Sequence, residues 1–312
     1  MLTCNIGWVK VIQCQCAKIM VMRWGAVMDT RNNKVQMDPH YGLVLVSPIR
    51  RGLAIAFIYL LLASPLMAAG LELVWAGGSY RISDNDNPSY TLDSFISMGS
   101  YNGMYLFSEP SLTLKQGELG VSIGAGMRVP VMGGQAIAGY NIFYDYTDNN
   151  NHERIGTGAE MYFRNFSAHI NIYLPLSGRE GREEALSGMD FTLGIPLPIK
   201  DAPSISIWPG FYYFRGEDES DMQGMSIEMH VQPMKVLMVK IGARNDTLSA
   251  GEDDNEVYLS VEIKMPMKKL GKDLFSYMPG IYPRNLGSYM DDRVVREHFI
   301  TYEKKTKPWY VY

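Results

Sequence analysis

The stretch "ERIGTGAEMYFRNFSAHINIYLPLSG", residues 153–178, decides the fold because its apolar residues recur at every second position. In its first half, one face of an extended chain carries Ile155, Thr157, Ala159, Met161 and Phe163. After Arg164 and Asn165 the alternation resumes, and the corresponding face carries Phe166, Ala168, Ile170, Ile172 and Leu174. A period of two that is interrupted by two turn residues predicts a hairpin of two strands.

The same alternation recurs through residues 70–267, at intervals of roughly 15 to 20 residues, which suits a membrane-crossing strand plus its turn. It predicts twelve strands, at about 71–82, 90–98, 103–114, 118–129, 134–146, 153–163, 166–174, 189–197, 204–214, 222–231, 235–245 and 256–265. Longer polar connections such as "PLSGREGREEALSG" follow odd-numbered strands, whereas "RN" and "QPM" follow even-numbered ones, with "KQG" as the exception. Long loops at one end and tight turns at the other are typical of an outer-membrane barrel.

The two faces of the clearest strands differ in charge. The later strands repeat an uncharged face: Met225, Ile227, Met229, Val231, Leu237, Val239, Ile241, Ala243, Val257, Leu259, Val261, Ile263 and Met265. The opposite faces carry Glu160, His169, Asn171, Glu228, His230, Lys240, Glu262 and Lys264. A basic residue on a lipid-facing surface near the bilayer centre costs about 2–4 kcal/mol, whereas a polar lumen tolerates it. The uncharged face is therefore predicted to meet lipid.

A soluble β-sandwich also keeps charge off its inner face, so alternation alone leaves that alternative open. The even strand number favours a barrel, because closure removes the unpaired edges of a large sheet. Aromatic residues near predicted strand ends also favour a membrane protein: Tyr140, Phe143, Tyr144, Tyr146, Phe211, Tyr212, Tyr213 and Phe214.

An apolar segment near the N-terminus predicts export. In "SPIRRGLAIAFIYLLLASPLMAAG" two arginines precede a short apolar run that ends in small residues, so residues 48–69 are predicted to be a secretory signal peptide. The run is short for a retained membrane anchor, which is the alternative. Residues 1–47 are then an extension from a misassigned start, with Met28 and Met37 as candidate starts.

All three cysteines, Cys4, Cys14 and Cys16, lie in that extension, without metal-site or thioredoxin spacing. Residues 70–312 keep 22 basic and 31 acidic residues, a net formal charge of −9. Such an acidic chain is not expected to bind nucleic acid.

Residues 138–178, "AGYNIFYDYTDNNNHERIGTGAEMYFRNFSAHINIYLPLSG", resemble the β-domain of the intimin and invasin family, the inverse autotransporters. The matching residues are Gly139, Tyr140, Asn141, Phe143, Asp145, Arg154, Ile155, Gly156, Gly158, Glu160, Asn171, Ile172, Tyr173, Leu176, Ser177 and Gly178. Two further stretches are similar to the family: "GVSIGAGMRV" (120–129) and "DDRVVREHFITYEKK" (291–305), the latter with Arg293, Arg296, Ile300, Tyr302 and Lys304 in matching places. Arg179 departs from the family, which usually has Trp after this PLSG.

The resemblance implies an all-β fold, a twelve-stranded antiparallel transmembrane barrel over residues 70–267, with residues 268–312 as a lumen linker and short tail. It implies that the linker forms a helix inside the lumen, and "MKKLGKDLFSYMPG" (267–280) and "NLGSYMDDRVVREH" (285–298) are expected in or near it. The residues expected to line the lumen or to carry the family motif are Asn141, Asp145, Arg154, Glu160, His169, Asn171, Glu228, Lys240, Glu262, Lys264, Arg293, Arg296 and Tyr302. Only seven residues follow Lys305, so no passenger is expected within this sequence.

No residue is predicted to be catalytic, and no metal or cofactor is expected. His169 with Ser167, and His230 with Ser226 or Glu228, have spacings that alternation on one strand produces by itself, so filling the lumen is the favoured role. The acidic loops at 216–221 and 250–255 lack the order of an EF-hand.

The sequence therefore predicts a bacterial outer-membrane protein, exported through its signal peptide, with a role in surface presentation or adhesion. The expected partners are outer-membrane lipid and lipopolysaccharide, the barrel-assembly machinery and periplasmic chaperones, and a receptor on a host or neighbouring cell. Two alternatives stay open: a narrow pore for small solutes, which requires residues 268–312 to leave the lumen open, and an outer-membrane lipid enzyme.

Overall fold

A computed structural model describes residues 27–29, 34–36, 70–148, 151–180, 183–216, 221–247, 253–267 and 272–304. The chain divides into two compact units, 1–62 and 63–312, and in the first β1 (Val27–Asp29) pairs antiparallel with β2 (Lys34–Gln36). The predicted signal peptide, the three cysteines, most of the N-terminal extension and the tail after residue 304 lie outside the described residues.

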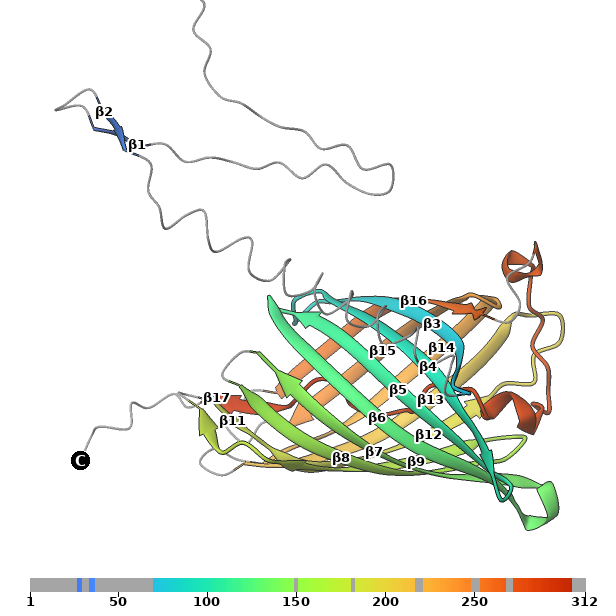
Figure 1. The fold of residues 1–312 in the computed structure, drawn as a ribbon. Helices are drawn as coiled ribbons and strands as arrows, with labels where there is room; N and C mark the ends of the chain where they lie inside the picture. The colour runs from blue at the N-terminus through green and yellow to red at the C-terminus, as the bar shows by residue number, and fades with distance from the viewer. Residues whose placement is uncertain are drawn as a thin grey trace, which may run out of the picture. The chain divides into compact units, whose positions relative to one another are not determined.

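The second unit contains a closed barrel of twelve antiparallel strands (Figure 1). The strands are β3 (Glu72–Ser83), β4 (Ser89–Tyr101), β5 (Met104–Lys115), β6 (Glu118–Val131), β7 (Ala136–Thr147), β8 (His152–Tyr162), β9 (Ser167–Pro175), β12 (Ser187–Pro196), β13 (Ser204–Arg215), β14 (Met222–Met234), β15 (Leu237–Thr247) and β16 (Asp253–Pro266). Each coincides with a predicted strand to within a few residues, so the predicted strand number and fold class are confirmed.

Pairing between the last and first strands closes the barrel. β16 aligns antiparallel with β3 from Tyr258 opposite Ser83 to Pro266 opposite Trp75. Because the barrel consists of an even number of antiparallel strands, β3 begins and β16 ends at the same end of the barrel. We call this end the base and the opposite end the exit end.

The predicted faces are those that the structure shows. On β8 and β9, alternate residues from His152 to Tyr162 and from Ser167 to Tyr173 are buried, whereas Ile170, Ile172 and Leu174 are exposed on the outside. Ile227, on β14, is 54% exposed, and Val261 and Ile263, on β16, are also exposed. An uncharged exposed surface around a polar interior is the arrangement that a lipid environment requires.

The predicted aromatic clusters divide between the two faces. Tyr140, Tyr144 and Phe211 point outward and are exposed, but Phe143 and Phe214 are buried inside the barrel. As evidence for a membrane protein, this set of eight aromatic residues therefore counts only for its outward-facing members. Strand alternation forces consecutive aromatic residues onto opposite faces.

Connections at the two ends differ less than predicted. The longest, between β9 and β12, lies at the exit end and contains β10 (Arg179–Glu180) and β11 (Glu183–Ala185). At the base, β6 and β7 are joined through the 3-10 helix η1 (Met132–Gly134), and β12 and β13 through residues 197–203. The base therefore carries longer connections in addition to tight turns.

Residues 272–304 follow the barrel and contain the 3-10 helices η3 (Lys272–Phe275) and η4 (Leu286–Tyr289) and the strand β17 (Tyr302–Lys304). Residues 277–279 lie at the base rim, where Tyr277 bridges Met234 and Pro279 bridges Pro203. Residues 267–280 were expected in or near the lumen, and the described portion at 277–279 lies at its base rim. Within the described residues, no helix has both the length and the apolar character needed to span a membrane.

β17 lies at the exit end, where it pairs with β11 in a small sheet of three strands (Figure 1). Residues 285–304 therefore pass through the barrel from base to exit, and we call them the threaded segment. The expected lumen helix is wrong for the described residues, since η4 is a single short turn and residues 291–301 are not helical. Lumen side chains bind the backbone groups of this segment, and an α-helix would engage those groups internally.

Candidate functional site in the barrel lumen

The threaded segment enters the lumen at the base through η4. Asn285 caps this turn, because its side chain accepts a hydrogen bond from the Gly287 amide. Leu286 and Tyr289 are buried against Ile137 of β7 and Tyr162 of β8. This apolar contact fixes the position at which the chain enters the barrel.

Arg128, on the inner face of β6, holds the backbone that follows η4. Its Nη1 atom donates to the carbonyl oxygens of Tyr289, Met290 and Asp292 at 2.9, 2.9 and 2.7 Å. Its Nε and Nη2 atoms bind the two carboxylate oxygens of Glu160, on β8, at 3.0 and 3.1 Å. The fully buried guanidinium thus has a charge partner and several acceptors, which offset its loss of water.

Other lumen side chains bind further backbone groups of the threaded segment. Carbonyl oxygens accept hydrogen bonds from the Trp75 indole at 2.7 Å (Asp291), the Asn171 amide at 2.9 Å (Val295) and Arg154 at 2.8 Å (Glu297). Backbone amides donate to Glu109 at 2.9 Å (Val294) and to the Tyr173 hydroxyl at 2.8 Å (Glu297). Because these contacts are to the main chain, they hold the segment extended.

Asp145, on β7, is the centre of a buried charge cluster. It accepts hydrogen bonds from Arg154 at 2.9 Å and Ser122 at 2.6 Å, and it forms an ion pair with Arg296 of the threaded segment. Arg296 also donates to Ser122 at 2.9 Å and lies 4.1 Å from the centre of the Phe143 ring. One carboxylate here balances two guanidinium groups, one from the barrel and one from the segment.

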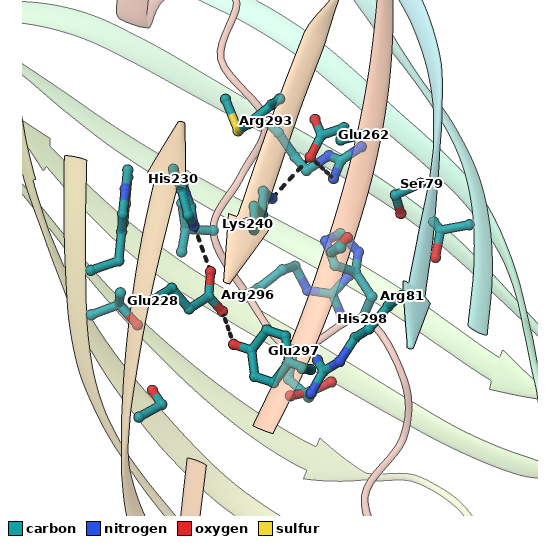
Figure 2. Close-up of a pocket in the computed structure, with 18 of the residues that line it drawn as sticks. Ser79, Arg81, Glu228, His230, Lys240, Glu262, Arg293, Arg296, Glu297 and His298 are labelled. Atoms are coloured by element: carbon teal, nitrogen blue, oxygen red, sulfur yellow. Dashed lines mark hydrogen bonds and ion pairs between the residues drawn. The ribbon is translucent and has the colours of Figure 1, made fainter. Parts of the chain in front are cut away.

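A second charge cluster surrounds Arg293, near the middle of the segment. Its guanidinium contacts Asp93 of β4 and Glu262 of β16, the latter at 3.2 Å. Glu262 also binds Lys240 of β15 at 2.9 Å, as Figure 2 shows. Ion pairs from two strands, β4 and β16, therefore converge on one side chain of the segment, and Lys240 of β15 joins the cluster through Glu262.

Between these two charge clusters, apolar contacts also hold the threaded segment. Val294 is buried with Trp75, Phe95, Phe107 and Phe143, which come from β3, β4, β5 and β7. The lumen is thus less uniformly polar than the sequence suggested, because an aromatic cluster surrounds one aliphatic side chain of the segment.

At the exit end the segment becomes a strand. Tyr302, Glu303 and Lys304 pair with Ala185, Glu184 and Glu183 of β11, and the Leu186 amide donates to the Thr301 carbonyl at 2.9 Å. The Tyr302 ring stacks on His152, with ring centres 5.9 Å apart. The loop between β9 and β12 thereby fixes the direction in which the chain leaves.

A cavity of about 550 Å³ lies beside the threaded segment, mainly against β13 to β16 and β3, and one or two residues from each of β4, β5, β8, β9 and β12 also line it. Figure 2 shows Glu228, His230, Lys240 and Glu262 along its wall, facing Arg293, Arg296 and His298 of the segment. His230 Nε2 and Glu228 are 2.5 Å apart, and Glu228 also accepts the Tyr258 hydroxyl. The segment therefore occupies only part of the lumen.

The structure places all thirteen predicted lumen or motif residues on the inside of the barrel or on the threaded segment. Ten of them take part in contacts between the wall and the segment or in the side-chain pairs that hold it: Asp145, Arg154, Glu160, Asn171, Lys240, Glu262, Lys264, Arg293, Arg296 and Tyr302. Among these, Lys264 donates to the Asp291 carbonyl at 3.2 Å. Asn141 and His169 are buried in the wall, with His169 3.0 Å from Ser167, and Glu228 and Lys240 line the cavity.

Sequence reasoning missed Arg128, Glu109, Asp93 and Trp75. For Arg128, Glu109 and Asp93 the available signal was a charged residue at a position that strand alternation turns inward. Arg128, for example, shares one face of β6 with Ser122, Gly124 and Gly126. Within the described residues, no group of three or more His, Cys, Asp or Glu side chains is arranged to hold a metal ion.

Comparison with known proteins identifies one family that the chain matches. A family model described as inverse autotransporter, beta-domain, matches residues 74–298. No curated protein matches the chain.

Solved structures align with this chain to different degrees, and the first of those below is similar in fold. A structure from a study of the in-meso crystallization of membrane proteins aligns with a TM-score of 0.65 and 19% identity, over 75% of this chain and 100% of that one. The KdgM porin gives a TM-score of 0.42 at 13% identity, covering 61% and 98% of the two chains. The translocator domain of the autotransporter NalP from Neisseria meningitidis gives 0.34 at 9%, covering 69% and 98%.

The family match spans the twelve strands and most of the threaded segment, which are the parts that the lumen contacts join. The matched residues include Arg128, Asp145, Arg293 and Arg296. The chain therefore belongs to the inverse autotransporter β-domain family, and it is an outer-membrane β-barrel.

Proposed function

We propose that this barrel anchors the chain in the bacterial outer membrane and presents the sequence C-terminal to β17 at the cell surface, where it serves adhesion. The observation that carries the proposal is the path of residues 285–304, which enter at the base and leave paired with β11 at the exit end. Contacts with β3, β5, β6, β8 and β9 hold this path along its length.

The orientation follows from the position of the first strand. β3 begins at the base, so a chain that is delivered from the periplasm after removal of a signal peptide at residues 48–69 has its base on the periplasmic side. The exit end, with the long β9–β12 connection, then faces the outside. Surface-exposed residues there are the ones that would meet lipopolysaccharide and a receptor on a host or neighbouring cell.

Biogenesis requires partners of a defined kind. Exposed apolar residues on the barrel exterior, such as Ile227 and Ile263, would aggregate in water, so the unfolded chain needs periplasmic chaperones. Insertion of a closed barrel then needs the barrel-assembly machinery. These partners are proposed on the chemistry of the exterior surface.

Protease treatment of intact cells tests the proposal. One variant carries an epitope tag after Tyr312, and a matched control carries the same tag between Gly70 and Leu71, at the base. We expect loss of the first tag from intact cells and survival of the second until the outer membrane is breached. Protection of the Tyr312 tag in intact cells would contradict surface presentation.

An outer-membrane lipid enzyme remains the rival of a different class. Ser167 and His169 do form a hydrogen-bonded pair, but both are buried in the lumen wall, away from the lipid-facing surface. A proton-transfer pair needs access to its substrate. Unchanged membrane lipids after expression are the result that we expect, and their hydrolysis would favour the enzyme.

A further inference from the structure

The threaded segment is held asymmetrically inside the barrel. Its described backbone hydrogen bonds go mainly to β5, β6, β8 and β9, where the inward-facing residues Glu109, Arg128, Arg154 and Asn171 are almost completely buried. On β13, β14 and β15 the inward-facing Trp208, Ser226, Glu228 and Lys240 are only partly buried, although Tyr212 and Phe214 toward the exit end of β13 are buried. One wall is therefore sealed by the segment and the facing wall is not.

The open side is continuous along the height of the barrel. The residues that line the 550 Å³ cavity include Ser83 and Asn87 at the exit end, Glu228 and Lys240 at mid-height, and Gln232 and Met278 at the base. One cavity therefore reaches from the β3–β4 turn to the base rim. At ~30 Å³ for each water, its volume corresponds to on the order of 20 water molecules.

The walls of this cavity suit water and dissolved ions. Serines line it on several strands, among them Ser206, Ser226 and Ser260, and the charged side chains of both signs are paired with one another. The side chains of Glu228 and Lys240 remain 30% and 20% accessible although they lie inside the barrel. A lining of this kind replaces part of the hydration shell of a passing ion.

We propose that the barrel is a narrow channel for inorganic ions and small hydrophilic solutes while its own segment remains threaded. The conducting path is the cavity between the segment and β13 to β16. This activity is separate from surface presentation: a barrel can present its tail without conducting, and conduction does not require anything beyond β17.

The test uses the full chain with Cys4, Cys14 and Cys16 replaced by serine, so that introduced cysteines are the sole thiols. A disulfide between Ala185→Cys and Tyr302→Cys, which are register partners of β11 and β17, locks the segment in the exit. In planar bilayers with KCl, we expect discrete current steps of the same size with this disulfide closed or reduced.

Two serine-to-cysteine variants then locate the path. Ser226 faces the cavity, whereas Ser122 faces inward on the sealed side and binds Asp145 and Arg296. A positively charged methanethiosulfonate reagent should modify Ser226→Cys and lower its conductance at least about twofold, because the adduct fills part of the narrow path. The reagent should not modify Ser122→Cys, and the conductance of that variant should stay the same after treatment.

Three results would overturn the proposal. The first is the absence of current steps from the folded protein. The second is a current that disappears when the Ala185–Tyr302 disulfide closes and returns on reduction, because the path would then exist only after the segment leaves. The third is modification of Ser226→Cys no faster than that of Ser122→Cys.

Discussion

The Asp145 carboxylate, on β7, contacts the Arg296 guanidinium of the threaded segment and at the same time binds Arg154 of the neighbouring strand β8. All three side chains are almost inaccessible to water. This single carboxylate therefore joins the barrel wall to the chain inside it, and the stability of the two parts is coupled.

Replacing Asp145 with asparagine should destabilise the folded barrel. The change leaves two buried guanidinium groups without their anion, and removal of one partner from a buried pair costs about 3–5 kcal/mol. Urea unfolding in detergent micelles, followed by tryptophan fluorescence, measures the loss. Ser122→Ala in the same cluster is the comparison and should lose less, since it removes a neutral hydroxyl whose hydrogen bonds to charged groups contribute about 1.5–3 kcal/mol. Equal losses for both variants would contradict the central role of Asp145.

Arg128→Lys should loosen the threaded segment although it keeps the positive charge. Lysine cannot bind both oxygens of Glu160 and three backbone carbonyls together, so we expect a loss of about 2 kcal/mol in the opening free energy of residues 285–295. Amide hydrogen exchange of these residues is the measurement.

Arg81→Lys provides the comparison for this prediction, because Arg81 forms an ion pair with Glu256 and its side chain remains 35% exposed. A pair of this exposure contributes little, so exchange in residues 285–295 should stay as in the parent chain. Unchanged protection in Arg128→Lys would show that the apolar contacts of Val294 suffice to hold the segment.

Gly124→Ala should overpack the lumen. A Cβ atom added at Gly124 would overlap the ring of Phe143, which packs against Val294 of the segment. Overpacking of this kind costs about 1–3 kcal/mol, and Phe143→Leu in the same chain should restore part of it.

The midpoint of urea unfolding measures both variants. Gly178→Ala serves as the matched glycine substitution, because an added Cβ there has no atom within 4 Å. Failure of Phe143→Leu to restore any stability would place the strain elsewhere than in this ring contact.

Neighbouring residues on β14 test which face meets lipid. Ile227 is exposed on the outside and Ser226 faces the cavity. Ile227→Lys should lower the stability of the barrel in lipid vesicles by about 2–4 kcal/mol if it lies near the bilayer centre. Ser226→Lys should be tolerated because its ammonium group meets water and acidic side chains.

The measurement is the folded fraction in vesicles across a urea series, read from the migration of unheated samples in gels. Equal tolerance of both lysines would contradict a lipid contact at Ile227. So would a monodisperse, fully structured chain in buffer without detergent.

The sequence by itself determined the strands and their faces. Alternation in residues 153–178 assigns Ile170 and Glu160 to opposite sides, because a strand has a period of two and only one side of a barrel can meet lipid. Together with the motif at 291–305, this sufficed to predict a barrel with a segment inside it.

Only the tertiary structure decided how that segment is held. Arg296 and Asp145 are 151 residues apart in the chain, and their pairing depends on closure of β16 on β3, on the stagger of the strands and on the side of the lumen that the segment follows. The same three-dimensional details replaced the expected helix with an extended chain and left a cavity beside it. Local sequence encodes periodicity, whereas long-range contacts are set by packing, which a one-dimensional pattern does not contain.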